Sequence, residues 1–125
     1  MNTNNKGRNK IITDLIEISI LAGERIENIY NSDFRSSIKS DGSPLTLADT
    51  ESNKIICGSL TKIDKDIPII SEENASIPYK ERSKWNTYWL VDPLDGTKEF
   101  MNKNGEFTTN IALIKNHKPI IGVVH

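Results

Sequence analysis

Three short polar clusters contain most of the residues that could do chemistry in this sequence. They span residues 41–49, 71–73 and 89–97, and each lies at one end of a predicted helix or apolar run. A rigid scaffold often presents functional side chains at the ends of its elements. We therefore treat the three clusters as candidates for one shared site.

The third cluster is the most informative, because its apolar run leads directly into Asp92. A carboxylate at the edge of a buried sheet is costly to leave without a partner. Pro93 and Gly96 are expected to turn the chain sharply, so that Asp92, Asp95 and the carbonyl of Leu94 face one space. Hard oxygen ligands of this kind suit Mg²⁺. The same pattern, taken alone, is also typical of an acidic surface turn.

Each of the first two clusters is also typical of a structure without catalytic function. Residues 71–73 alone suggest a solvated loop, and Thr46 with Asp49 alone suggests a helix cap. An EF-hand is a poor fit, because Leu94 stands where a third loop ligand belongs. With one Cys and two His, the chain has neither an internal disulfide nor the ligand spacing of a zinc site. Three clusters at the ends of buried elements favour a shared Mg²⁺ site.

Two helices and four strands are predicted to position the clusters. Residues 12–30 carry apolar or small residues at three- and four-residue steps, which indicates a helix with one buried face. A second helix is expected to begin near Thr46, which can cap it, and to end before residues 64–68, because Pro68 disfavours helix at the preceding residue. The predicted strands are 67–70, 87–91, 107–114 and 119–124, with a hairpin loop at 116–118. This order predicts an α+β domain, with two helices packed on a mainly antiparallel sheet.

Composition limits the class of protein. The chain has 125 residues and a formal charge of -1, and its pI is about 6.1. This length is typical of one compact domain, and the charge argues against binding a nucleic acid polymer. No apolar run approaches the roughly 20 residues that span a bilayer. Residues 1–12 are expected to form a polar arm. We expect a cytoplasmic protein, and peripheral association with the inner face of the cell membrane stays open.

The clusters resemble the N-terminal motifs of the Mg²⁺-dependent, lithium-sensitive inositol monophosphatase superfamily. The matching segments are Asp41-Gly-Ser-Pro-Leu-Thr-Leu-Ala-Asp49, Ser71-Glu-Glu73 and Trp89-Leu-Val-Asp-Pro-Leu-Asp-Gly-Thr97. The continuation, residues 98–114, is closer to the bacterial bisphosphate nucleotidases of that superfamily: Lys98-Glu99-Phe100 replaces the usual Thr-Asn-Phe. The resemblance implies that 13–125 form the N-terminal, metal-binding α+β part of a layered αβαβα sugar-phosphatase fold.

The resemblance also implies a role for each site residue. The metal ligands would be Glu72, Asp92, Asp95 and the carbonyl of Leu94, holding two or three Mg²⁺ ions in a site that Li⁺ inhibits. Asp49 and Thr97 would orient the attacking water together with Glu72. The residues expected to line the phosphate pocket are Glu72, Leu94, Asp95, Gly96 and Thr97.

The implied reaction is hydrolysis of the 3'-phosphate of adenosine 3',5'-bisphosphate to AMP and phosphate, in sulfur assimilation. One alternative is an inositol or sugar phosphatase of the same superfamily. The other is an inactive truncated fragment, since the family's C-terminal half, with the Asp that completes the second metal site, has no counterpart in this sequence. The sequence predicts no oligomeric state.

Overall fold

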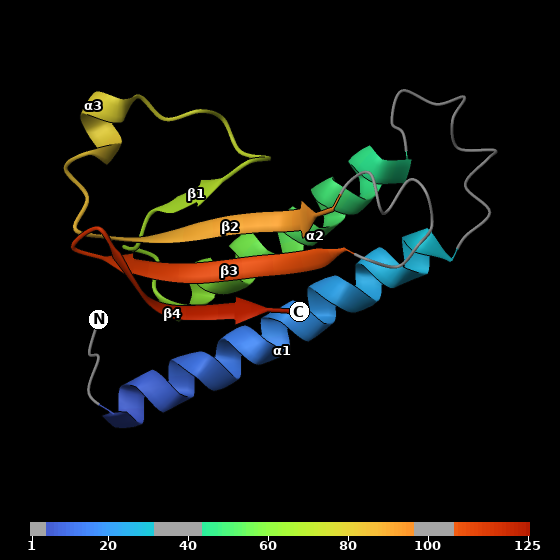
Figure 1. Cartoon of the computed structure of the whole chain (residues 1–125), viewed down its shortest axis with the longest axis horizontal. Helices are drawn as coiled ribbons and strands as arrows, with labels where there is room; N and C mark the ends of the chain where they lie inside the picture. The colour runs from blue at the N-terminus through green and yellow to red at the C-terminus, as the bar shows by residue number, and fades with distance from the viewer. Residues whose placement is uncertain (1–4, 32–43, 97–106) are drawn as a thin grey trace.

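The computed structural model describes residues 5–31, 44–96 and 107–125, which form helices packed on a mixed sheet (Figure 1). The elements are α1 (Asn5–Tyr30), α2 (Pro44–Ile63), β1 (Ile69–Ser71), α3 (Tyr79–Arg82), β2 (Thr87–Asp95), β3 (Thr108–Lys115) and β4 (Lys118–Val124). The predicted α+β class is confirmed. The short helix α3, which precedes β2, was not predicted.

The sheet has the strand order β1-β2-β3-β4. β1 runs parallel to β2, and the other two pairs are antiparallel. The predicted hairpin between β3 and β4 is confirmed. Its turn residues Asn116 and His117 have φ values of 51° and 65°, as the two central positions of a type I′ hairpin turn require.

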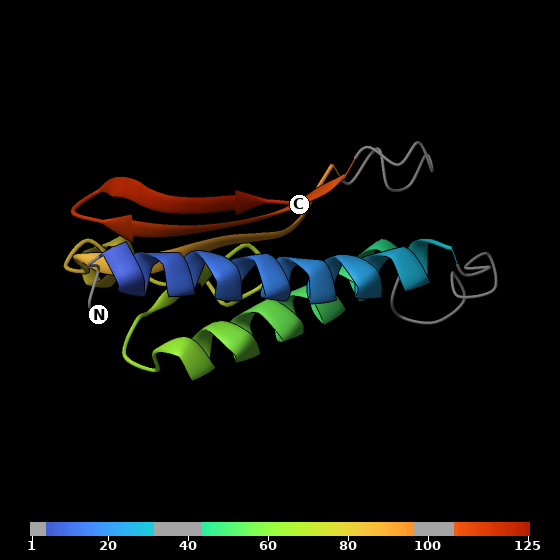
Figure 2. The ribbon, with the colours of Figure 1, turned by 90° about the horizontal axis from the view of Figure 1, so that it is seen from below.

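The two long helices cover one face of the sheet (Figure 2). α1 packs on β3 and β4, whereas α2 packs on β2. Along β2, Trp89 and Val91 are buried between the sheet and the helices, and Leu90, which points to the other face, is 45% exposed. The main core consists of Ile11, Leu15, Ile18, Ala22, Ile56, Leu60, Trp89, Val91, Ile111, Leu113 and Ile121.

Helix α1 begins earlier than predicted. Residues 5–12, expected to belong to a polar arm, form its first two turns. Ile11 is buried in the core, and Lys10 Nζ lies 3.0 Å from Asp14 Oδ2, a pair one turn apart that supports the helix. Although α1 has 26 residues, no helix in the described ranges is long and apolar enough to cross a membrane.

Helix α2 begins at Pro44, so Thr46 lies inside its first turn and the predicted Thr46 cap is wrong. Proline is well suited to the first helical position, because its fixed φ matches the helix and the missing N–H would have no partner there. Starting at Pro44 places Asp49 in the second turn of α2. This turn lies near the C-terminal ends of β1 and β2.

Candidate metal centre

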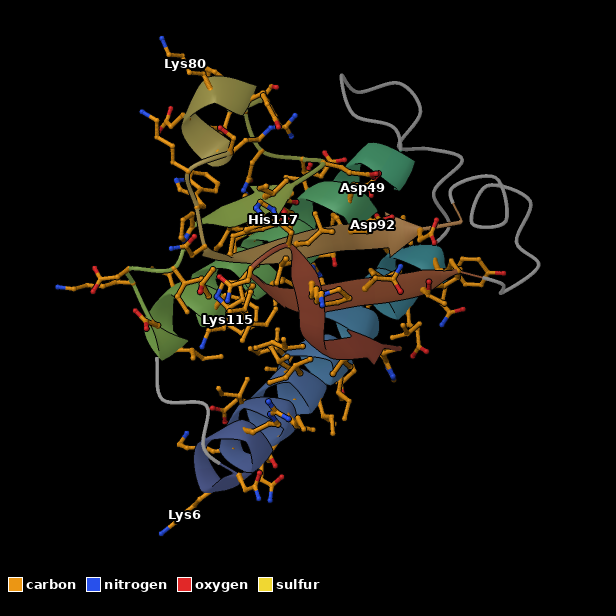
Figure 3. All side chains as sticks on the ribbon, turned by 60° about the vertical axis from the view of Figure 1, so that its left-hand side comes forward. Lys6, Asp49, Lys80, Asp92, Lys115 and His117 are labelled. Atoms are coloured by element: carbon orange, nitrogen blue, oxygen red, sulfur yellow. The ribbon has the colours of Figure 1, made fainter. Side chains whose placement is uncertain are left out.

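Five carboxylates from three separate elements gather at one end of the sheet. Asp49 comes from α2, Glu72 and Glu73 from the turn after β1, and Asp92 and Asp95 from the end of β2. The pairing of Ser71 with Val91 in the parallel strands brings Glu72 and Asp92 next to each other at this edge. Figure 3 labels Asp49, near the start of α2, and Asp92, near the end of β2.

Burial, together with repulsion from neighbouring carboxylates, raises the pKa values of two members of this group, Asp49 and Asp92. Burial raises the pKa of Asp49 to about 7, with further increases from the charges of Glu73, Asp92 and Glu72. Burial also raises the pKa of Asp92 to about 6, reinforced by the charges of Glu72 and Asp95, although a hydrogen bond from the Leu94 amide opposes the change. Such mutual destabilisation of charged forms is what a bound cation would relieve.

The sharp turn predicted from Pro93 and Gly96 required β2 to end before Asp92. The structure differs from this prediction. The strand continues to Asp95 and contains a bulge instead: Asp92 pairs with Asn110 and Asp95 with Thr108. Proline has no N–H for the ladder, so it is accommodated where the ladder is already interrupted. Gly96 follows with φ 91°, a value that side chains disfavour.

Two hydrogen bonds hold this bulge, one from a helix and one from the neighbouring strand. The buried Ser52 Oγ on α2 donates to the carbonyl of Pro93 at 2.8 Å, and Thr109 Oγ1 on β3 donates to the same oxygen at 3.3 Å. The side chain of Leu94 is buried in a second apolar cluster with Ile26, Ile29 and Ala48. The loop backbone between Asp92 and Asp95 is therefore held from both sides.

The structure brings together four predicted site residues: Asp49, Glu72, Asp92 and Asp95. Leu94 lies in the bulge and Gly96 directly follows β2. Thr97 and residues 41–43 of the first cluster lie outside the described residues. Sequence reasoning missed Ser52, Asn53 and Asn110. The sequence signal for Ser52 and Asn53 was a polar side chain on or beside the buried face of α2. For Asn110 it was a polar side chain on the strand paired with Asp92.

The carboxylates suit a hard divalent cation. Asp92 Oδ1 is buried and has no hydrogen-bond partner among the described residues. Neither ion pair seen among these residues, Lys10–Asp14 or Arg25–Glu51, includes a member of the cluster. In the described part of the chain, no three His, Cys, Asp or Glu side chains are grouped to hold one ion by themselves. A set of two carboxylates, the Leu94 carbonyl and water would not need such a group, because Mg²⁺ commonly retains water ligands.

Comparison with known proteins gives the class. Residues 8–125 match the Inositol monophosphatase family, and the chain belongs to this family. Two relatives are the 3'(2'),5'-bisphosphate nucleotidase CysQ of Buchnera aphidicola, 47% identical over 118 residues, and that of Escherichia coli K12, 42% identical over 117 residues. These matches cover 93% and 92% of this chain, but 44% and 47% of the relatives. The chain thus spans about half their length.

A solved structure agrees with this placement. The crystal structure of CysQ from Bacteroides thetaiotaomicron, a bacterial member of the inositol monophosphatase family, matches with a TM-score of 0.82 and 41% identity. The match covers 93% of this chain and 42% of that one. The helix pair and the mixed sheet therefore belong to a fold that this family shares.

The raised pKa values predict how stability depends on pH and metal. A carboxyl whose pKa is raised on folding stabilises the protein fully below its usual value of 3.8, and this contribution is lost as pH rises to about 6 for Asp92 and 7 for Asp49. We expect the metal-free chain to melt at a higher temperature at pH 5 than at pH 8. Mg²⁺ should narrow this gap, because it binds the ionised form.

Thermal unfolding followed by circular dichroism, with EDTA or with Mg²⁺ at both pH values, measures this effect. Asp49→Asn should reduce the pH dependence of the metal-free melting temperature. An equal or higher metal-free melting temperature at pH 8 would contradict the assignment of these raised pKa values.

Proposed function

We propose that the protein carrying this chain is a Mg²⁺-dependent phosphomonoester hydrolase that removes the 3'-phosphate of adenosine 3',5'-bisphosphate, giving AMP and phosphate. The observation that carries the proposal is the electrostatic coupling of Asp49 to Glu72, Glu73 and Asp92, and of Asp92 to Glu72 and Asp95. The buried Oδ1 of Asp92, which has no hydrogen-bond partner among the described residues, adds to it. The names of the CysQ relatives support the choice of substrate. In this proposal the partner is a small nucleotide rather than a nucleic acid polymer, and the enzyme works in the cytoplasm, in sulfur assimilation.

In the proposed site, Glu72, Asp92, Asp95 and the Leu94 carbonyl would hold the metal ions, whose charge would stabilise the phosphoryl group during its transfer. Asp49 and Thr97 would orient the attacking water together with Glu72. The amides of Gly96 and Thr97 would be the donors to phosphate oxygens. Phosphoryl transfer depends on positioning and charge stabilisation, so the site needs no Ser, Cys or His nucleophile.

An inositol or sugar phosphatase is the second candidate, because the matched family takes its name from inositol monophosphatase. The acidic cluster is common to both functions, since it serves the phosphoryl group rather than the remainder of the substrate. The choice between them depends on residues that contact the nucleoside or the sugar ring.

A chimera tests the proposal directly. Residues 8–125 replace the matched segment of the Escherichia coli K12 relative, and phosphate release is measured for adenosine 3',5'-bisphosphate and for inositol 1-phosphate. We expect kcat/KM to favour the nucleotide by at least about 100-fold, because a site that hydrogen-bonds one substrate strongly rejects another lacking those groups. A preference for inositol 1-phosphate would support the second candidate.

The 125-residue chain is assayed beside the chimera, with Mg²⁺ and with EDTA. Activity of the chimera without activity of the chain would support the fragment interpretation, and comparable activity would reject it. Activity of the chimera that persists in EDTA would contradict the metal dependence.

A further inference from the structure

A network of uncharged side chains joins α2 to the turn that follows β1. Its centre is Asn53, whose Oδ1 accepts hydrogen bonds from Ser71 Oγ at 2.6 Å and from Cys57 Sγ at 3.3 Å. Asn53 Nδ2 donates to Asn74 Oδ1 at 2.9 Å, and Asn74 Nδ2 donates to Cys57 Sγ at 3.8 Å. One amide therefore contacts both ends of the turn.

Ser71 extends this network into the backbone of the turn. The Glu73 amide donates to Ser71 Oγ at 3.4 Å, and the Asn74 amide donates to the Ser71 carbonyl at 3.1 Å. Ser71 itself is buried. Glu72 lies between these anchored residues, so its backbone position depends on the contact between Ser71 and Asn53.

Electrostatics explains why such an anchor is needed. Glu72 and Glu73 both raise the pKa of Asp49, so the turn and α2 carry like charges that repel each other. Asn53 follows Asp49 by four residues on α2, and residues with this spacing share one face of a helix. A carboxylate at position 53 would add to the repulsion, whereas a basic side chain would compete with a metal ion for the carboxylates. A neutral amide does neither.

We propose that Asn53 is a positioning residue of the metal centre. It holds the turn against α2 through Ser71 and Asn74, and so keeps Glu72 beside Asp49 and Asp92 before any cation binds. The part of this inference that concerns metal affinity rests on the proposed function, whereas the part that concerns the turn does not.

The test uses the full 125-residue chain with Asn53→Leu, which keeps a similar side-chain volume but removes every hydrogen bond of the amide. Mn²⁺ binding is measured by calorimetry, and hydrogen exchange of the Glu73 and Asn74 amides is measured without metal. We expect Mn²⁺ to bind about 10-fold more weakly, as is usual when a residue that orients a metal ligand is removed. Both amides should exchange faster, by about 10-fold, because their closed state loses its anchor.

Two further comparisons keep the test specific. Ser71→Ala should reproduce both effects, whereas Ser71→Thr, which retains the hydroxyl, should restore them to near the unmodified values. Thr61→Ala is the matched control: its hydroxyl lies on the same helix and donates to the Cys57 carbonyl at 2.8 Å, away from the turn after β1. A general loss of stability would lower the melting temperature of a variant, but it would not produce both effects in Ser71→Ala together with near-unmodified values in Ser71→Thr. If Asn53→Leu does not fold, the comparison of Ser71→Ala with Ser71→Thr tests the positioning role in its place.

The outcomes separate the two proposals. Unchanged Mn²⁺ affinity and unchanged exchange in both Asn53→Leu and Ser71→Ala would overturn the positioning role, even where the unmodified chain binds Mn²⁺ tightly. Failure of the unmodified chain to bind Mn²⁺ would contradict the metal centre instead. Faster exchange in Asn53→Leu would then still support the role of Asn53 in holding the turn.

Discussion

Replacing Asp92 with Asn should abolish phosphate release by the chimera, with a loss of at least about 10³-fold in kcat, because metal ions supply several kcal/mol of charge stabilisation in such reactions. The same substitution should raise the melting temperature of the metal-free chain. Asp92 is half-buried, its pKa is raised to about 6 by burial and by Glu72 and Asp95, and Asn removes the charge that folding disfavours. Loss of activity with a gain in stability would distinguish a functional carboxylate from a structural one.

Phosphate release and thermal unfolding in EDTA measure the two effects on Asp92→Asn. Asp66→Asn is the control, because Asp66 is an exposed acidic residue in the turn after α2 and should change neither quantity. Retention of more than a tenth of the kcat by Asp92→Asn would remove Asp92 from the metal ligands. A lower metal-free melting temperature would contradict the charge repulsion.

Trp89→Ala should lower the free energy of unfolding by about 3–5 kcal/mol, the range found when a buried aromatic side chain is truncated. Trp89 is fully buried on β2 and belongs to the core between the helices and the sheet. Its loss would leave a cavity beneath the strand that leads into Asp92. Urea denaturation followed by circular dichroism measures the change.

Two variants show whether this cost comes from the buried ring. Trp89→Phe should cost clearly less than Trp89→Ala, because it retains a ring and removes an indole N–H that has no hydrogen-bond partner in the described part of the chain. Trp85→Ala, at the half-buried residue before β2, should cost about 1 kcal/mol or less. An equal loss at the two tryptophans would contradict the assignment of Trp89, rather than Trp85, to the core.

Local patterns were sufficient for the elements whose signals are strong. The spacing of the apolar or small residues Leu15, Ser19, Ala22 and Ile26 identified α1, because a buried helix face repeats every three or four residues. The alternation along β3 and the short polar turn after it identified the hairpin. The start of α1 was missed, since the residues before Ile11 are polar and become helical only through packing at Ile11 and pairing along the helix.

The chemical character of the site was equally visible in the sequence. Carboxylates at the ends of apolar runs indicated a cation, and the motif resemblance indicated the family, which the match over residues 8–125 confirms. The bulge in β2 was not visible. A Pro–Leu pair before a second Asp is compatible with either a turn or an interrupted ladder, and the pairing of β3 with β2 on both sides of the interruption decides between them.

The sequence by itself therefore determined the α+β class, the family and which carboxylates are candidates for the site. The tertiary structure decided how they meet. Asp49, Glu72 and Asp92 lie on three elements that are far apart along the chain, and no local pattern specifies distances between such elements. The parallel register of β1 with β2, the Ser52 contact to the bulge and the Asn53 contact to the turn bring them together. These are contacts between side chains and backbone distant in sequence, so only the packed fold contains them.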